Sequence, residues 1–157
     1  MSKNNQKTIL TYGTFDLFHI GHLRLLQRLS ERADKLIVAV STDEFNREKG
    51  KKTMIPFAER AEIVENLKCV DHVIPEVTWD QKIEDVKKYD VDIFAIGDDW
   101  EGKFDFLKEH CEVVYLKRTE NISSTGLKNS LRKFSSIPKE DIINAFEIIE
   151  KLKREFE

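Results

Sequence analysis

Two histidines lie three residues apart in the segment YGTFDLFHIGH, residues 12–22. At the start of a helix, His19 and His22 can point to one side and donate hydrogen bonds to a phosphoryl oxygen. The segment follows a short apolar run and contains Gly13 and Gly21. Glycine has no Cβ, so it lets another group approach the backbone closely. The segment therefore indicates an anion-binding turn, a metal site, or a plain connection between a strand and a helix.

Zinc is the metal to weigh first, because imidazole and the carboxylate of Asp16 are both competent ligands for it. However, neither a cysteine nor a third histidine lies close by in the sequence. The motifs G-x-G-x-x-G and G-x-x-x-x-G-K-[ST] do not occur either. The amino end of a helix attracts phosphate through its unpaired N–H groups and its dipole. These residues alone leave phosphate binding and a structural turn as open alternatives.

Other candidate phosphate ligands are basic or hydroxylated. The segment REKGKK (47–52) carries Lys49 and Lys51, although such a run is typical of a solvated loop. Arg118 follows an apolar run, and its planar guanidinium matches the oxygens of a phosphate. The run Ser-Ser-Thr at 123–125 is typical of a helix N-cap and also offers hydroxyl groups.

Apolar runs alternate with amphipathic stretches, which predicts a parallel sheet with helices on both faces. We expect strands at 8–12, 36–40, 70–75, 92–96 and 112–116, helices at 22–33, 56–68, 81–88 and 123–134, and a helical turn at 106–110. Ligands bind outside the carboxyl ends of such strands. We therefore expect the polar segments 13–19, 41–54, 97–105 and 117–125 to be loops that share one site.

Composition indicates a globular protein of 157 residues, 40% apolar and 35% charged, with 26 basic against 29 acidic residues and a net charge of −3. The absence of a basic arm argues against nucleic-acid binding. Cys69 and Cys111 have no C-x-x-C spacing, as is usual in a reducing cytosol. The first residues suggest neither a signal peptide nor a membrane span. We expect a cytoplasmic protein without stable membrane insertion.

The segment SSIP at 135–138 predicts a break before a last amphipathic helix at 139–156. The expected division is a catalytic domain at 1–134 and a C-terminal helical extension at 135–157.

The segment GTFDLFHIGH resembles the G-x-F-D-x-x-H-x-G-H signature of the HIGH-type nucleotidyltransferases. Their cytidylyltransferase branch has a second signature, R-T-x-G-I-S-[ST]-[ST], which RTENISST at 118–125 resembles. The stretches STDEFN (41–46), VDHVIP (70–75) and GDDWEGKFDFL (97–107) are similar to the glycerol-3-phosphate cytidylyltransferase family in particular. The resemblance spans about residues 7–133 and implies a Rossmann-like α/β fold with a parallel five-stranded sheet.

That resemblance implies transfer of a cytidylyl group from CTP to sn-glycerol 3-phosphate, which gives CDP-glycerol, a teichoic-acid or related surface-polymer precursor, and pyrophosphate. It also implies Mg²⁺ or another divalent cation as cofactor, no zinc, and a homodimer that uses the segment Asp71–Pro75. A cytidylyltransferase for ethanolamine phosphate or for a polyol or sugar phosphate stays open. So does a non-catalytic nucleotide-binding regulatory module, which is a different class of protein.

By the same resemblance, the catalytic residues are His19, His22, Lys49, Lys51 and Arg118. The nucleotide is expected to contact Thr14, Phe15, Asp16, His19, His22, Asp99, Arg118, Thr119, Ile122, Ser123, Ser124 and Thr125. The acceptor is expected to contact Lys49, Lys51, Arg60 and Trp100, and Asp16 is the implied metal ligand.

Two positions depart from the family pattern. Asn121 stands where the family usually has glycine, and asparagine tolerates a left-handed backbone better than most residues. Lys68 stands where close relatives carry arginine, so a bidentate contact there would be weakened.

Overall fold

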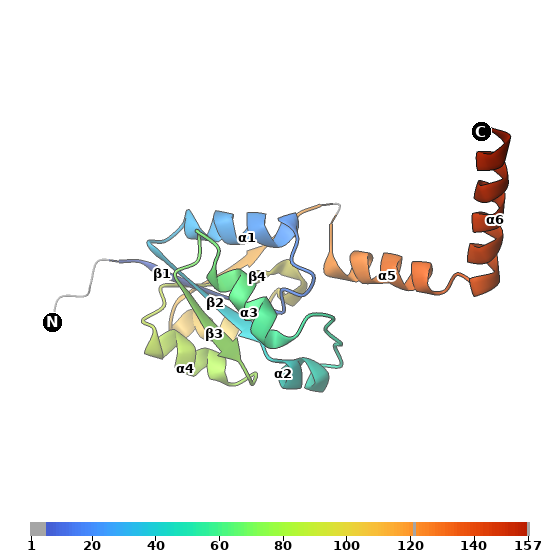
Figure 1. Ribbon diagram of the computed structural model, residues 1–157. Helices are drawn as coiled ribbons and strands as arrows, with labels where there is room; N and C mark the ends of the chain where they lie inside the picture. The colour runs from blue at the N-terminus through green and yellow to red at the C-terminus, as the bar shows by residue number, and fades with distance from the viewer. Residues whose placement is uncertain (1–5, 121, 157) are drawn as a thin grey trace. The chain divides into compact units, whose positions relative to one another are not determined.

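The structure is a computed structural model that describes residues 6–120 and 122–156. Its first compact unit ends at Ile122 and is built around one parallel sheet (Figure 1). The strands are β1 (Thr8–Gly13), β2 (Lys35–Ser41), β3 (His72–Glu76), β4 (Ile93–Gly97) and β5 (Glu112–Leu116), in the order β3-β2-β1-β4-β5. This arrangement confirms the predicted α/β class with five parallel strands.

Helices cover both faces of this sheet. The unit contains α1 (Ile20–Ser30), α2 (Asp43–Glu48), α3 (Phe57–Glu65) and α4 (Gln81–Lys88), with two short 3₁₀ helices, η1 (Asp98–Trp100) and η2 (Asp105–Glu109). Leu26 of α1 and Val64 of α3 pack in one apolar cluster, and Val86 of α4 packs in the other. In Figure 1, α1 and α4 lie on opposite sides of the strands.

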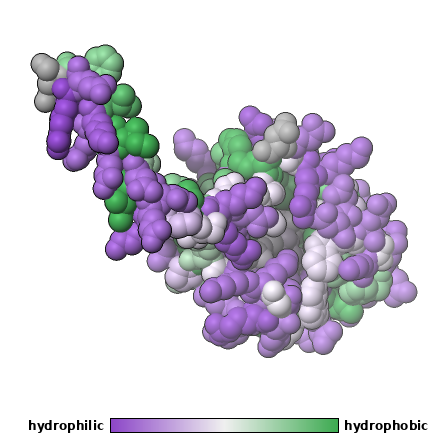
Figure 2. Space-filling view, turned by 90° about the vertical axis from the view of Figure 1, so that its right-hand side faces the viewer, coloured by the Kyte–Doolittle hydropathy of each residue, from purple (hydrophilic) through white to green (hydrophobic). Residues whose placement is uncertain are grey.

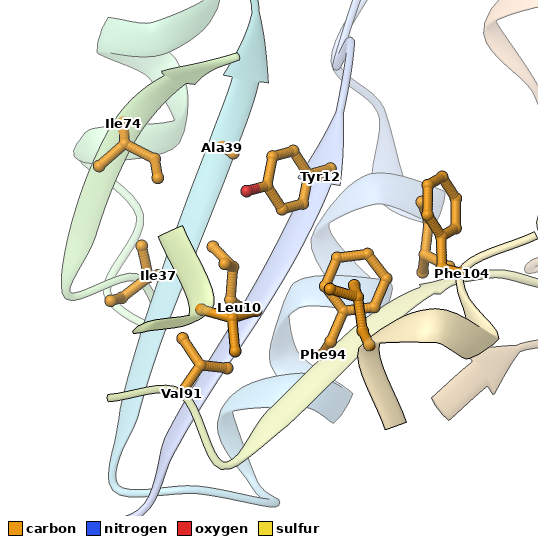
Figure 3. Close-up of a cluster of buried hydrophobic side chains, with 11 residues drawn as sticks. Leu10, Tyr12, Ile37, Ala39, Ile74, Val91, Phe94 and Phe104 are labelled. Atoms are coloured by element: carbon orange, nitrogen blue, oxygen red, sulfur yellow. The ribbon is translucent and has the colours of Figure 1, made fainter. Parts of the chain in front are cut away.

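Alternation along the strands supplies both apolar clusters. In β1, Leu10 and Tyr12 face the α4 side, whereas Ile9 faces the α1 side. Figure 3 shows the first of these clusters, in which Leu10 lies beside Ile37 of β2 and Phe94 of β4. Because successive side chains of a strand point to opposite faces, a strand covered on both sides is apolar almost throughout.

The carboxyl ends of the strands are level with one another. Gly13 of β1 is in register with Val40 of β2, and Ser41 of β2 is in register with Glu76 of β3. The strand order reverses at β1, so that the loops after β1 and β4 open on the point where ligands bind in such sheets. The fold therefore gathers the predicted loops at one edge.

One expected loop is wrong in part, because the segment 41–54 contains the helix α2. The hydroxyl of Thr42 accepts a hydrogen bond from the backbone N–H of Phe45 and caps this helix. Asp43 and Glu44 in the first turn suit the positive end of the helix dipole. Phe45 is buried and anchors a helix that is otherwise polar, which is why hydrophobic periodicity did not predict it.

Residues 123–157 group as a second compact unit, whose described part contains α5 (Ser124–Ser135) and α6 (Lys139–Glu155). This division precedes α5, whereas we expected the boundary after residue 134. Leu127, Leu131 and Phe134 follow one another at helical spacing on α5, and Figure 2 shows apolar side chains along this unit. Within the described residues, no helix is long and apolar enough to cross a membrane.

Candidate functional site

His19 and His22 are held by the backbone at the start of α1. The Nδ1 atom of His19 accepts a hydrogen bond from the N–H of Gly21 at 3.0 Å, which makes His19 the N-cap of the helix. The Nδ1 atom of His22 accepts from the N–H of His19 at 3.3 Å. An Nδ1 atom that accepts a hydrogen bond carries no proton, so the proton of each neutral ring is on Nε2. The turn thus holds two Nε2–H donors in fixed orientations.

The two imidazoles are stacked, with ring centroids 3.8 Å apart and planes inclined by 19°. Burial lowers the pKa of His19, and it lowers the pKa of His22 to about 4, with a smaller contribution from the neighbouring His19. Both rings are therefore neutral near pH 7. They are suited to donate hydrogen bonds to an anion without adding a buried charge of their own.

The glycines of this segment leave room for side chains of the same turn. A Cβ atom at Gly21 would lie 2.8 Å from Cε1 of His19, and one at Gly13 would lie 2.7 Å from the ring of Phe15. Phe15 itself has a φ of 53°, in the left-handed region that larger residues rarely adopt. Its ring is buried and meets the edge of His22 at a centroid distance of 5.4 Å. The predicted close approach at these glycines therefore comes from inside the turn.

Asp16 joins the turn to the segment that precedes α3. Its carboxylate accepts hydrogen bonds from the N–H groups of Met54 at 2.8 Å, Ile55 at 2.9 Å and Leu17 at 3.1 Å. The residue is only 2% exposed. Among the described residues, no group of three or more His, Cys, Asp or Glu side chains could hold a metal ion. The donor set therefore does not form a metal cage, and the metal role of Asp16 stays a prediction.

Arg60, an expected acceptor ligand, is buried and only 1% exposed. Its guanidinium donates hydrogen bonds to the carbonyl oxygens of Thr14 at 2.6 Å, Ser41 at 2.9 Å and Ile55 at 2.8 Å. It also pairs with the carboxylate of Asp43 at 2.7 Å. These bonds engage the guanidinium in holding the ends of β1 and β2 against α2, and contact of Arg60 with the acceptor stays a prediction.

The two predicted lysines differ in their surroundings. Lys49 ends α2, and its side chain is only 8% exposed because it turns inward onto Glu76. Lys51 is exposed, and its Nζ atom lies 5.8 Å from the centroid of the Trp100 ring. Both lysines follow the carboxyl end of β2, one with a buried side chain and one exposed beside Trp100.

Asp99 and Arg118 form an ion pair between the loops that follow β4 and β5. Both side chains are well exposed, so the pair is weak and another anion can displace the carboxylate. Thr14 donates a hydrogen bond to the side chain of Asn46 at 3.1 Å, and Thr119 is half-buried beyond β5. The loops after β1, β2, β4 and β5 thus contribute predicted residues to the site.

The remaining predicted residues lie close to the boundary between the two units. Ile122 approaches the start of α1, since a Cβ at Gly21 would lie 3.0 Å from its Cγ2. Asn121 falls outside the described residues. Ser123 caps α5 by accepting from the N–H of Gly126 at 3.0 Å, and Ser124 and Thr125 begin that helix in the second unit. Their contact with nucleotide stays a prediction.

Two charged residues at the carboxyl edge of the sheet were not predicted from the sequence. Glu76, at the end of β3, and Lys82, in α4, are 3% and 1% exposed and form an ion pair at 2.7 Å. Lys82 is spaced three and four residues from Asp85 and Val86, so all three share the buried side of α4. This spacing was the available signal that Lys82 is buried. A lysine on a short polar helix normally faces water, so this signal carried little weight.

Replacing Gly21 by alanine should displace the His19 ring and weaken the helix cap, because the added Cβ overlaps Cε1 and Nδ1 of that ring. We expect a loss of about 1–3 kcal/mol in the free energy of unfolding, the usual cost of overpacking. Urea denaturation measures it. Gly97→Ala is the matched control, since a Cβ there has open space. Equal stability of the two variants would contradict the steric role of Gly21.

The depressed pKa of His22 should make the protein less stable in acid. Between the ordinary histidine pKa of about 6.5 and the folded value of about 4, the unfolded chain binds more protons, so stability falls as the pH drops. His22→Gln should remove up to about 3 kcal/mol of this acid loss. Denaturation in urea at pH 7 and pH 4 measures it, with exposed His110→Gln as control. Identical pH slopes for wild type and His22→Gln would refute the assignment.

Comparisons of this chain with known protein families and with known proteins agree with one another. Residues 10–144 match the family described as cytidylyltransferase-like. Glycerol-3-phosphate cytidylyltransferase from Staphylococcus aureus is 56% identical over 125 residues, which cover 80% of this chain and 95% of that protein. The enzyme of the same name from Bacillus spizizenii is 55% identical over 125 residues, covering 80% and 97%.

A solved structure supports the fold independently. The lipopolysaccharide core biosynthesis protein from Thermoplasma volcanium superposes with a TM-score of 0.63 at 24% identity, over 73% of this chain and 99% of that one. At this identity the likeness concerns the fold alone. With the family match over residues 10–144 and the two close relatives, we conclude that the chain belongs to the cytidylyltransferase-like family.

Proposed function

We propose that this protein transfers the cytidylyl group of CTP to sn-glycerol 3-phosphate, giving CDP-glycerol and pyrophosphate. The observation that carries the proposal is the 54–56% identity to three glycerol-3-phosphate cytidylyltransferases over nearly their whole length. The paired Nε2–H donors of His19 and His22 at the carboxyl edge of β1 agree with it, because nucleotidyl transfer requires donors aimed at a phosphoryl group.

The reaction is one displacement at phosphorus. A phosphate oxygen of glycerol 3-phosphate attacks the α-phosphorus of CTP, a new P–O bond forms, and the bond to the β-phosphate breaks as pyrophosphate leaves. No covalent intermediate with the protein is needed. The work of the protein is to bring two anions together and to stabilise the charge that develops on the transferred group.

Each part of that work falls to a different loop. His19 and His22 donate to the α-phosphate and to the bridging oxygen through Nε2–H. Lys49 and Lys51 offset the repulsion between the two reacting phosphates, which is strong at close range. Arg118 releases Asp99 and binds the outer phosphates of CTP in its place.

The remaining nucleotide contacts come from polar and backbone groups. Thr119 and the run Ser123, Ser124 and Thr125 supply hydroxyls to the β- and γ-phosphates, and Thr14 and Phe15 contribute backbone close to them. Asp99, once released from Arg118, can accept a hydrogen bond from the nucleotide. Trp100 shelters the acceptor beside Lys51.

Mg²⁺ or another divalent cation is proposed to enter bound to CTP, held mainly by the triphosphate and water. This fits a site whose one candidate protein ligand, Asp16, already accepts three backbone N–H groups. Such an ion would neutralise phosphate charge. Pyrophosphate release measured with CTP and glycerol 3-phosphate in the presence of EDTA tests whether the reaction requires such an ion.

We also propose a cytoplasmic homodimer that makes a precursor of teichoic acid or a related surface polymer. The two cysteines of the chain are free, as suits a reducing compartment. The proposed interface is the segment Asp71–Pro75, which includes the edge strand β3. Pro75 in this strand has no N–H, so pairing through side chains is favoured over a sheet continued into the partner.

A panel of acceptors tests the function directly. With CTP, we expect glycerol 3-phosphate to stimulate pyrophosphate release and to yield CDP-glycerol, whereas ethanolamine phosphate and ribitol 5-phosphate leave the release at background. ATP in place of CTP is the control for the nucleotide. Coupled pyrophosphate assay and mass spectrometry provide the readouts. No stimulation by glycerol 3-phosphate would end this proposal.

Replacing His19 by asparagine separates catalysis from capping. The Oδ1 atom of asparagine can take the place of Nδ1 and keep the N-cap, but nothing replaces the Nε2–H donor. We expect kcat to fall by about 10²–10³-fold with little change in the affinity for CTP or in stability. Steady-state kinetics, calorimetric CTP binding and urea denaturation measure the three quantities. A kcat within a few-fold of wild type would show that His19 has only a structural role.

A further inference from the structure

Three charged side chains share one buried site at the carboxyl edge of the sheet, and we call them the buried charge cluster: Lys49, Glu76 and Lys82. The exposed fractions of their side chains are 8%, 4% and 1%. The Nζ atom of Lys82 lies 2.7 Å from Oε1 of Glu76, and the Nζ atom of Lys49 lies 3.4 Å from Oε2. One carboxylate therefore serves two ammonium groups, one on each oxygen.

Ser41 completes the link between Lys49 and Glu76. The Nζ atom of Lys49 donates to its hydroxyl oxygen at 2.9 Å, and the hydroxyl donates to Oε2 of Glu76. Ser41 and Glu76 are in register at the ends of β2 and β3, so the strand pairing itself sets this contact. The ring of Phe45 lies beneath the Lys49 ammonium at 4.3 Å. The position of Lys49 is thus defined from three sides.

The cluster is poorly explained as a device for stability alone. Removing charges from water is costly, and a buried ion pair is often no more stabilising than apolar residues of the same size. Here two ammonium groups share one carboxylate at the edge where phosphates are expected, so Glu76 neutralises each of them only in part. A structural role would be better served by one carboxylate for each lysine, whereas a lysine that is only partly neutralised can still attract an anion.

We propose that Glu76 is a positioning residue for Lys49, whose ammonium it holds, together with Ser41, at the place where the reacting phosphates meet. The proposal rests on the proposed function for the role of Lys49 in the reaction. Glu76 itself does not touch substrate. It acts by fixing where the Lys49 charge lies and by supplying the negative charge that keeps this lysine ionised in a buried setting.

The charges around Lys49 predict the direction in which each substitution should move its pKa. Burial lowers the pKa of Lys49, and Glu76 of β3 opposes this effect. The like charges of Lys51, on the same loop, and of Lys82, on α4, lower the pKa further. The other buried carboxylate of this region, Asp85, accepts from the hydroxyl of Tyr12 and from Gln81 instead. Loss of Glu76 and loss of Lys82 should therefore move the pKa of Lys49 in opposite directions.

The test compares Glu76→Gln with Lys82→Met in the full-length protein. In Glu76→Gln, we expect the alkaline limb of the pH profile of kcat/KM to move down by about 1–3 units. We expect kcat at pH 7 to fall by about 10²-fold, the usual effect of a misplaced group. In Lys82→Met, the alkaline limb should move upward, because Glu76 then serves Lys49 alone. Alkaline limbs that stay at the wild-type pH in both folded variants would overturn the proposal.

Asp85→Asn is the matched control, since it also replaces a buried carboxylate of this region by an amide. It should leave the alkaline limb in place, and an equal shift in this variant would count against a specific role for Glu76. Glu76→Asp keeps the charge on a shorter side chain, so it should restore the limb while kcat stays low. If Glu76→Gln does not fold, Lys82→Met and Glu76→Asp carry the same comparison.

A measurement without substrates separates this inference from the proposed function. NMR of ¹³Cε-labelled lysine, with the Lys49 signal assigned from Lys49→Arg, should show the Lys49 pKa lowered in Glu76→Gln and raised in Lys82→Met. If wild type makes no CDP-glycerol, the proposed function fails, and this titration still decides whether Glu76 controls Lys49. A Lys49 signal that titrates identically in all three proteins would refute the positioning role.

Discussion

The buried guanidinium of Arg60 is the interaction on which the rest of the site depends. An arginine cannot shed its proton in a protein, so its burial requires that several acceptors converge on it. They come from the ends of β1 and β2, from the start of α2 and from the segment before α3. Asp16 makes the reciprocal arrangement nearby, since its buried carboxylate gathers N–H groups from the turn and from the same segment. Together these two residues join the turn after β1, the connection from β2 to α2 and the segment before α3 into one frame.

Within that frame, the groups of the site differ in their charge and in their burial. The histidine pair is neutral and held by backbone groups, so its donors require no rearrangement when an anion arrives. The buried charge cluster places two ammonium groups on one carboxylate. The pair of Asp99 and Arg118 is exposed and exchangeable. A site built in this way is rigid where the transferred group would lie and adaptable where a nucleotide must enter and leave.

Much of the fold could be predicted because its signals are local. The runs LIVAV and DIFAI are continuous and apolar, as strands covered on both faces must be, and they became β2 and β4. The turn with His19 and His22 was equally visible, because its glycines and histidines are adjacent in sequence. The burial of Arg60 and Glu76 was not predictable in this way, and that of Lys82 was indicated only weakly, by its spacing to Asp85 and Val86. A charged side chain is buried only when partners from distant segments meet it, and no local pattern records such a meeting.

The contact between His19 and a glycine two residues later also limits how this segment can evolve. Because the imidazole occupies the space that a Cβ at Gly21 would need, a larger residue 21 requires the ring of residue 19 to shift or to be replaced. Gly13 and Phe15 are coupled in the same manner. Single substitutions at either glycine therefore give a strained protein, and a paired change at residue 19 or 15 would relieve the strain. The spacing of the segment would then persist through packing even in descendants that had abandoned its chemistry.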